Sequence, residues 1–256
     1  MNDTHNFHDI NKLPKDYGIL VFPISISRTE NKTGQDPTEC LEYVNHFSPT
    51  KISAPKVGLN FVYSDSLYFY SNEKASVLKE KFMHIVLKHK NTLKKLISKE
   101  QQNLQIQHSF SYEVWNQLYL SYEGDFGHDF SNFKKIYHND ENFQKYLKED
   151  ADFSGRDLDE NQINFFLEEH FMLYLISKKK VAFPNEYIMG REQWVLWCYP
   201  GPPLKASIYT YQLNPLKLDA PDNLYQNHSY DLESKILTDA TKVDLETYNY
   251  KYPEKG

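Results

Sequence analysis

The feature that most constrains the fold is a short, uninterrupted apolar run near the start of the chain. It extends from Ile19 to Ile24 within a stretch, 17–26, that is too short for a buried helix and fits a strand covered on both faces. Further strand-like and helix-like patterns alternate along the chain. Because such alternation is typical of a mostly parallel sheet with helices on both faces, the sequence predicts an α/β fold.

The pattern of apolar residues divides the chain into nine predicted elements. The predicted strands cover 17–26, 56–66, 103–110, 192–201 and 206–213. The predicted helices cover 36–47, 71–100, 111–149 and 158–177. We expect a single domain over 1–256, with a polar N-terminal segment at 1–16. No pattern assigns a structure to the tyrosine-rich tail, 218–256.

Composition supports a globular chain that does not enter a membrane. Of its 256 residues 40% are hydrophobic and 25% are charged, so a substantial core can form. No apolar run approaches the roughly 18 residues of a membrane helix, and the polar start lacks the apolar region of a signal peptide. Cys40 and Cys198 are too few for a disulfide framework. We therefore expect a cytoplasmic protein with no membrane attachment.

The sequence lacks the motifs of several common nucleotide-binding and metal-binding sites. The chain contains neither G-x-G-x-x-G nor G-x-x-x-x-G-K-[ST], so nucleotide binding through those loops is unsupported. The ten histidines form no H-E-x-x-H pair, and no C-x-x-C is present. We expect neither a metal nor another cofactor.

Polar residues stand at the predicted carboxyl ends of three strands, which is where parallel sheets bind ligands. These residues are Ser25, Asp65 and Tyr199. Ser25 does not lie in the G-x-S-x-G turn of an α/β-hydrolase. It is either a nucleophile at the mouth of a site or a serine that ends a strand and caps a turn.

A line of lysines follows the longest predicted helix. Lys74, Lys81, Lys88 and Lys95 recur every seven residues, and Lys99 follows one turn later. Seven residues are nearly two helical turns, so these side chains share one face. The net charge of −6 argues against a general nucleic-acid binder, so a basic line on one helix requires its own explanation. It is either a solvated surface or a ladder for RNA phosphates.

A glutamate lies on the apolar side of a later helix. Glu169 falls at i±3 or i±4 spacing from Phe165 and Met172, and Ile176 follows two turns later on the same side, whereas Glu168 is expected to point elsewhere, near Leu175. A carboxylate in apolar surroundings is costly and is often functional. The alternative is a salt bridge to a lysine.

Taken in order along the chain, these features resemble a tRNA-dependent cyclodipeptide synthase, in particular the subfamily with a Tyr-Pro signature. The features are a serine after the first strand, a lysine-bearing helix, F-F-L-E-E in a late helix, and W-C-Y-P-G closing a late strand. The resemblance extends from about Ile19 to Leu216. Pro23 stands where relatives often have glycine, and Phe165 stands where the family has tyrosine.

The resemblance implies a Rossmann-like domain similar to the catalytic domain of class I tyrosyl- and tryptophanyl-tRNA synthetases. It implies a ping-pong aminoacyltransferase that joins the aminoacyl groups of two aminoacyl-tRNAs into a 2,5-diketopiperazine, through aminoacyl-serine and dipeptidyl-serine enzymes. By this resemblance Ser25 is the nucleophile, Glu169 holds the α-ammonium group and Tyr199 positions a proton. Phe165, Asp65 and Pro200 border the aminoacyl group, and the lysine-bearing helix docks tRNA.

Two other functions remain open on the sequence. One is a serine esterase, which the missing nucleophile turn disfavours. The other is a non-catalytic tRNA-binding module, which leaves Ser25, Glu169 and Tyr199 without a joint role.

Overall fold

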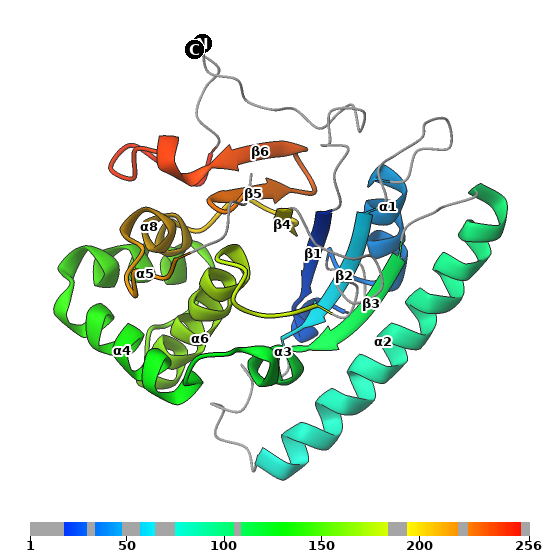
Figure 1. Ribbon diagram of the computed structural model, residues 1–256, viewed down its shortest axis with the longest axis horizontal. Helices are drawn as coiled ribbons and strands as arrows, with labels where there is room; N and C mark the ends of the chain where they lie inside the picture. The colour runs from blue at the N-terminus through cyan, green and yellow to red at the C-terminus, as the bar shows by residue number, and fades with distance from the viewer. Residues whose placement is uncertain are drawn as a thin grey trace.

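The centre of the molecule is a six-stranded sheet with the strand order β3-β2-β1-β4-β5-β6 (Figure 1). The computed structural model describes residues 18–29, 34–47, 57–64, 75–104, 109–183, 194–219 and 225–251. Its strands are β1 (Gly18–Ile24), β2 (Val57–Tyr63), β3 (Ser109–Val114), β4 (Trp194–Tyr199), β5 (His228–Asp231) and β6 (Ile236–Asp239). All neighbours pair in parallel except β5 and β6, which pair antiparallel. The predicted mostly parallel sheet is therefore confirmed.

Helices connect the strands and cover the sheet. The α-helices are α1 (Pro37–Phe47), α2 (Ala75–Leu104), α3 (Trp115–Ser121), α4 (Phe126–Asn139), α5 (Glu141–Phe153), α6 (Glu160–Ser177) and α8 (Lys205–Leu213). Two 3-10 helices follow strands, η2 (Ile26–Arg28) and η4 (Ala240–Lys242). None of these helices, in the described part of the chain, is long and apolar enough to cross a membrane.

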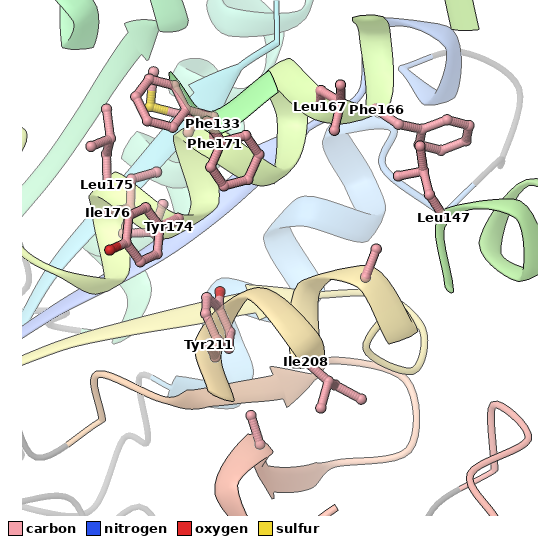
Figure 2. Packing of buried hydrophobic residues seen from close by; sticks show 14 of the residues in the cluster. Phe133, Leu147, Phe166, Leu167, Phe171, Tyr174, Leu175, Ile176, Ile208 and Tyr211 are labelled. Atoms are coloured by element: carbon pink, nitrogen blue, oxygen red, sulfur yellow. The ribbon is translucent and has the colours of Figure 1, made fainter. Parts of the chain in front are cut away.

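The alternation of side chains along the strands divides the core into two layers. Leu20 and Phe22 of β1 pack with buried residues of α1 and α2. Ile19 and Val21 point to the opposite face and pack with α3–α6 and α8. Figure 2 shows part of this second layer, where α6 faces α8 across the apolar core. Helices on both faces were predicted, and the two layers confirm them.

Two predictions about individual elements are wrong. Helix α2 continues to Leu104 and β3 runs from Ser109 to Val114, so the third strand lies later than 103–110. The segment 206–213 is helix α8 and not a strand. The tail, for which no structure was predicted, contributes β5 and β6 to the sheet, and η4 follows them within its described residues.

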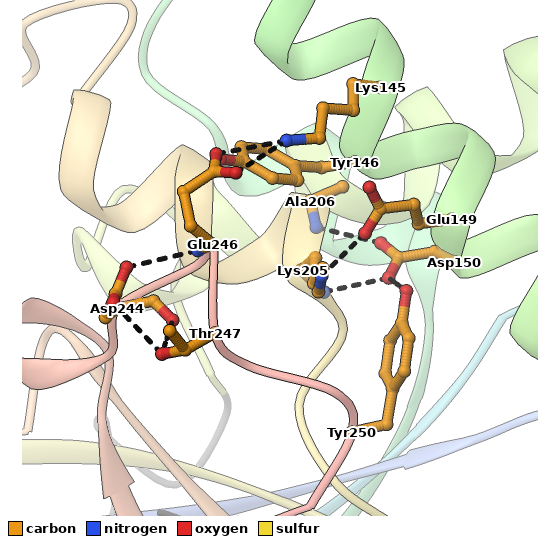
Figure 3. Close-up of polar contacts among 10 residues, drawn as sticks. All are labelled: Lys145, Tyr146, Glu149, Asp150, Lys205, Ala206, Asp244, Glu246, Thr247 and Tyr250. Carbon is orange, nitrogen blue, oxygen red and sulfur yellow. Dashed lines mark hydrogen bonds and ion pairs between the residues drawn. The ribbon is translucent and has the colours of Figure 1, made fainter.

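Asp150 explains why 206–213 is helical despite its β-branched and aromatic residues. Its carboxylate accepts hydrogen bonds from the backbone N–H groups of Lys205 and Ala206, both at 2.8 Å, at the start of α8. Tyr250 donates a third, at 2.7 Å (Figure 3). An acceptor at this position satisfies N–H groups that a helix leaves unpaired. Asp150 thus joins α5, α8 and the C-terminal segment, and it is fully buried.

Replacing Asp150 with alanine removes these three hydrogen bonds and leaves buried donors without an acceptor. We expect Asp150→Ala to lower the free energy of unfolding by about 2–4 kcal/mol, measured by chemical denaturation. Asp125→Ala is the matched control, because Asp125 caps α4 at an exposed position, and we expect it to cost about 1 kcal/mol. Equal losses in the two variants would contradict the central role of Asp150.

Candidate active site

The strand order places a topological switch point between β1 and β4. From β1 the chain adds β2 and β3 on one side, and β4 is followed by β5 and β6 on the other side. In open parallel sheets the crevice beyond the carboxyl ends at such a point is the usual ligand site. Ser25 follows β1 directly and Tyr199 ends β4, so both lie at this crevice.

The strands β1 and β4 part before β1 ends. Their pairing extends to Val21 opposite Trp197, whereas the pairing of β1 with β2 continues to Ile24 opposite Tyr63. Pro23 lies in the unpaired part and has no N–H group to donate. The hydrogen-bonded ladder between β1 and β4 therefore ends before the candidate site is reached.

Near the end of β1 the backbone groups face alternate sides. The carbonyl of Ile24 points toward β2, where it accepts hydrogen bonds from the backbone N–H and the hydroxyl of Ser64, at 3.1 and 3.0 Å. Successive residues of a parallel strand direct these groups to opposite neighbours. Pro23 and Ser25 consequently direct theirs toward the gap left by β4.

The side chain of Gln35 fills this position. Its Oε1 accepts a hydrogen bond from the backbone N–H of Ser25 at 2.8 Å, and its Nε2 donates one to the carbonyl of Pro23 at 2.5 Å. A primary amide presents one acceptor beside one donor, as a peptide group on a neighbouring strand does. Gln35 is buried and follows the 30–33 segment, which lies outside the described residues. No sequence pattern marked this residue.

Ser25 and Tyr199 face the same side of the sheet. Ile19, Val21 and Val195 point into the layer that contains α6. The backbone of Ser25 is still extended (φ −73°, ψ 121°), so alternation gives its side chain the same direction. Tyr199 shares this direction because it lies four residues after Val195 in the same strand.

Arg28 connects the carboxyl ends of β1 and β4. Its Nη1 donates a hydrogen bond to the hydroxyl of Tyr199 at 3.2 Å, and its guanidinium carbon lies 5.7 Å from the centre of that ring. Its own backbone N–H binds the carbonyl of Ser25 at 2.9 Å, which closes η2. Ser25 is half-buried, and its Oγ lies 3.0 Å from the Oγ of the exposed Ser27. The structure therefore brings Ser25, Arg28 and Tyr199 together.

The segment after Tyr199 is also fixed. Pro200 is buried, and Gly201 adopts φ +120°, a conformation that favours glycine. The backbone N–H of Gly201 donates to Oδ1 of the buried Asp231 at 2.8 Å. This contact holds the Tyr-Pro segment against β5.

Helix α6 covers this face and carries Phe165 and Glu169. A helix that returns the chain to a parallel strand runs against the strand direction, so the first half of α6 lies toward the carboxyl ends. Glu169 is surrounded by protein, although part of its surface remains accessible, and this burial raises its pKa to about 7. The positive charge of Arg156 opposes that shift, and the Arg156 guanidinium carbon lies 5.0 Å from the centre of the Phe165 ring.

Glu168, expected to lie well round the helix from Glu169 and near Leu175, is itself buried. Its Oε1 accepts a hydrogen bond from the hydroxyl of Tyr119 at 2.5 Å. The helix α3 supplies this partner, and the helical spacing of α6 alone could not reveal it. Glu168 and Glu169, which are adjacent in α6, are therefore both enclosed by protein, and Glu168 has the less accessible surface.

Two predicted residues cannot be placed. Asp65 lies outside the described residues, although Ser64, directly before it, ends at the site beside β1. Lys74 also lies outside them. Within the described ranges no group of three or more His, Cys, Asp or Glu side chains could hold a metal ion.

The lysine-bearing face of α2 is directed to solvent, as its spacing predicted. The lysines at 81, 88, 95 and 99 are all exposed. The opposite face of the helix is buried against the sheet through Phe82, Val86 and Leu93. Lys94 lies beside this line and places its Nζ 4.9 Å from the centre of the Tyr112 ring.

Comparison with known proteins yields structural resemblances alone. No family model matches the sequence, and no curated protein does. A cyclodipeptide synthase (CDPS) structure from Fluoribacter dumoffii has 16% identity and a TM-score of 0.48, over 80% of this chain and 87% of that chain. A CDPS structure from Staphylococcus haemolyticus has 13% identity and a TM-score of 0.49, over 80% and 86%.

A third similar structure is a Mycobacterium tuberculosis protein, described as demonstrating that cyclodipeptide synthetases are related to type I tRNA synthetases. It has 11% identity and a TM-score of 0.44, over 71% of this chain and 72% of that chain. Such low identities and TM-scores assign no role to any residue. The function therefore has to be argued from the side chains at the switch point.

The raised pKa of Glu169 makes a prediction about stability. Its pKa rises from 4.5 to about 7 on folding, so the folded state holds the proton more tightly and loses stability as pH rises through this window. The full shift corresponds to about 3 kcal/mol, and solvent contact reduces this to about 1–2 kcal/mol. In Glu169→Gln, the free energy of unfolding relative to wild type should rise by that amount between about pH 5 and pH 8. A difference that does not change with pH would contradict the assignment.

Proposed function

We propose that this chain is a tRNA-dependent cyclodipeptide synthase of the Tyr-Pro subfamily. The observation that carries the proposal is the junction of Ser25 and Tyr199 through Arg28 at the switch point. Both side chains share the face covered by α6, which bears Glu169. A nucleophile, a phenol, a guanidinium and a carboxyl group of raised pKa are suited to acyl transfer.

In the first step Ser25 Oγ attacks the ester carbon of one aminoacyl-tRNA. The bond to the terminal ribose oxygen breaks, the serine proton passes to that oxygen, and tRNA leaves. One ester replaces another, so the exchange is nearly isoenergetic and needs no cofactor. Covalent capture also divides a difficult reaction into easier steps. Tyr199, whose hydroxyl accepts a hydrogen bond from Arg28, would hold or pass that proton.

In the second step the tethered amine must be the nucleophile. If the amine of the second substrate attacked the seryl ester, the product would be a dipeptidyl-tRNA and free Ser25. Attack by the amine of the tethered aminoacyl group on the second ester instead leaves a dipeptide on Ser25 and releases the second tRNA. The new free amine then attacks the seryl ester, which closes the six-membered ring and frees the serine.

Glu169 is suited to hold the ammonium group of the tethered aminoacyl ester. A carboxyl group with a pKa of about 7 can also accept the proton that this ammonium must lose before it attacks. Phe165, beside Arg156, would then contact the aminoacyl group, with Asp65 and Pro200 at the border of the same site. A phenylalanine at this position can pack but cannot donate a hydrogen bond.

The exposed lysines of α2 supply the contact to tRNA in this proposal. Lysine makes flexible contacts to phosphate and does not read bases, which suits a substrate recognised through its backbone. These lysines stand out in a chain whose net charge is −6. In this proposal tRNA therefore binds at the lysine-bearing face of α2 and not over the whole surface.

Replacement of the nucleophile tests the reaction. In a cell-free mixture with aminoacyl-tRNAs, we expect cyclic dipeptides from the wild type by mass spectrometry. Ser25→Ala should reduce the yield at least about 100-fold because the covalent step is lost. Ser27→Ala is the matched control two residues away and should retain activity within a few-fold. Undiminished product from Ser25→Ala would refute the nucleophile, and hydrolysed amino acid alone would indicate an esterase.

Removal of two lysines tests docking. In Lys81→Ala/Lys88→Ala we expect the KM for aminoacyl-tRNA to rise about tenfold with kcat nearly unchanged. The slope of log affinity against log salt concentration should become less steep by about two. Lys135→Ala/Lys148→Ala removes the same charge from exposed positions on α4 and α5. It should leave KM within about twofold, because those lysines lie on the other layer. Equal effects of the two double variants would argue against docking on α2.

A further inference from the structure

We propose that Gln35 and His89 are positioning residues that hold the backbone of Ser25 in its reactive position. This inference rests on the proposed function, in which Ser25 is the nucleophile. It concerns two buried residues, one located two residues before α1 and one in α2, that take no direct part in the chemistry.

The first part of the argument is the missing strand partner. Beyond Val21, β1 has lost the recorded pairing with β4, and the N–H of Ser25 and the carbonyl of Pro23 face the gap. The amide of Gln35 satisfies both groups, at 2.8 and 2.5 Å. Two hydrogen bonds on either side of Ile24 fix both the position and the rotation of the peptide groups that precede the Ser25 side chain. Gln35 thereby holds the backbone from which the Ser25 side chain projects.

The second part is the support of Gln35 by α2. His89 Nε2 lies 2.8 Å from the backbone carbonyl of Gln35. A carbonyl can only accept, so Nε2 carries the proton and Nδ1 must accept from the hydroxyl of Tyr63 at 2.9 Å. Burial lowers the pKa of His89, which favours this neutral form. Every polar atom of the ring therefore has a defined partner, and the tautomer is fixed.

The third part is the position of His89 on the helix. It lies on the buried side of α2, one residue after the exposed Lys88. The helix proposed to bind tRNA is thus connected through Tyr63 and Gln35 to the end of β1. Binding and positioning nevertheless use different faces of α2, one exposed and one buried. Loss of Gln35 or His89 should therefore impair the chemical step and spare affinity for tRNA.

Single-turnover acylation separates these two effects. The aminoacyl adduct on the folded protein is followed by intact mass at saturating aminoacyl-tRNA. Gln35→Met keeps the length of the side chain and removes both hydrogen bonds, and we expect the acylation rate to fall about 10- to 100-fold. The Kd for tRNA should stay within about twofold of wild type. His89→Phe should act in the same direction, because the carbonyl of Gln35 loses its donor.

Gln212→Met is the matched control. Gln212 also donates its side-chain amide to backbone carbonyls, those of Ala240 and Val243, at 2.6 and 2.9 Å, but near η4. It should leave the acylation rate within about twofold. If acylation slowed equally in Gln35→Met and Gln212→Met, the effect would be a general structural one, and the inference would be overturned. If Gln35→Met fails to fold, Gln35→Asn keeps the amide and shortens its reach, and the same loss of rate is expected.

Amide hydrogen exchange at Ser25 gives a readout that needs no activity. In Gln35→Met and Gln35→Asn the Ser25 N–H loses its acceptor, so its exchange should accelerate at least about tenfold, while Gln212→Met leaves it unchanged. A wild type that forms no adduct would refute the proposed function, and exchange would still decide whether Gln35 holds Ser25. Unchanged exchange, or normal acylation by folded Gln35 variants, would overturn the inference.

Discussion

The separation of β1 from β4 is the constraint on which the candidate site depends. Parallel strands at the centre of a sheet normally satisfy each other's backbone groups along their whole length. Here the recorded pairing ends at Val21, and Pro23 could not have continued it as a donor. The carboxyl ends of β1 and β4 are thus available to a substrate. Gln35 holds the backbone at the end of β1, and Arg28 links that end to Tyr199 at the end of β4.

Proline at position 23 acquires a physical explanation from this geometry. Proline is unusual inside a central strand because it removes a ladder hydrogen bond. In this chain the missing donor lies just beyond the last β1–β4 pair, Val21 opposite Trp197, and the Pro23 carbonyl binds Gln35 instead of β4. A residue that appears misplaced in the sequence therefore marks the place where the sheet opens.

The sequence predicted what depends on local periodicity, and it failed where partners come from distant parts of the chain. The central strand and the exposed lysines of α2 followed from spacing alone. The error at 206–213 arose because Asp150, which caps α8, lies more than fifty residues earlier. The partner of Glu168 was not predicted because Tyr119 belongs to another helix. Gln35 could not be anticipated, since its role exists only once two strands have parted.

Peptide mapping after an acid quench measures the central proposal most directly. The protein is mixed with one aminoacyl-tRNA, digested and analysed by tandem mass spectrometry. The proposal predicts one aminoacyl group, as an ester on Ser25, that disappears when a second aminoacyl-tRNA is added and cyclic dipeptide is released. An acyl group on Ser27 or on a lysine, or no acyl group under conditions that sustain product formation, would contradict it.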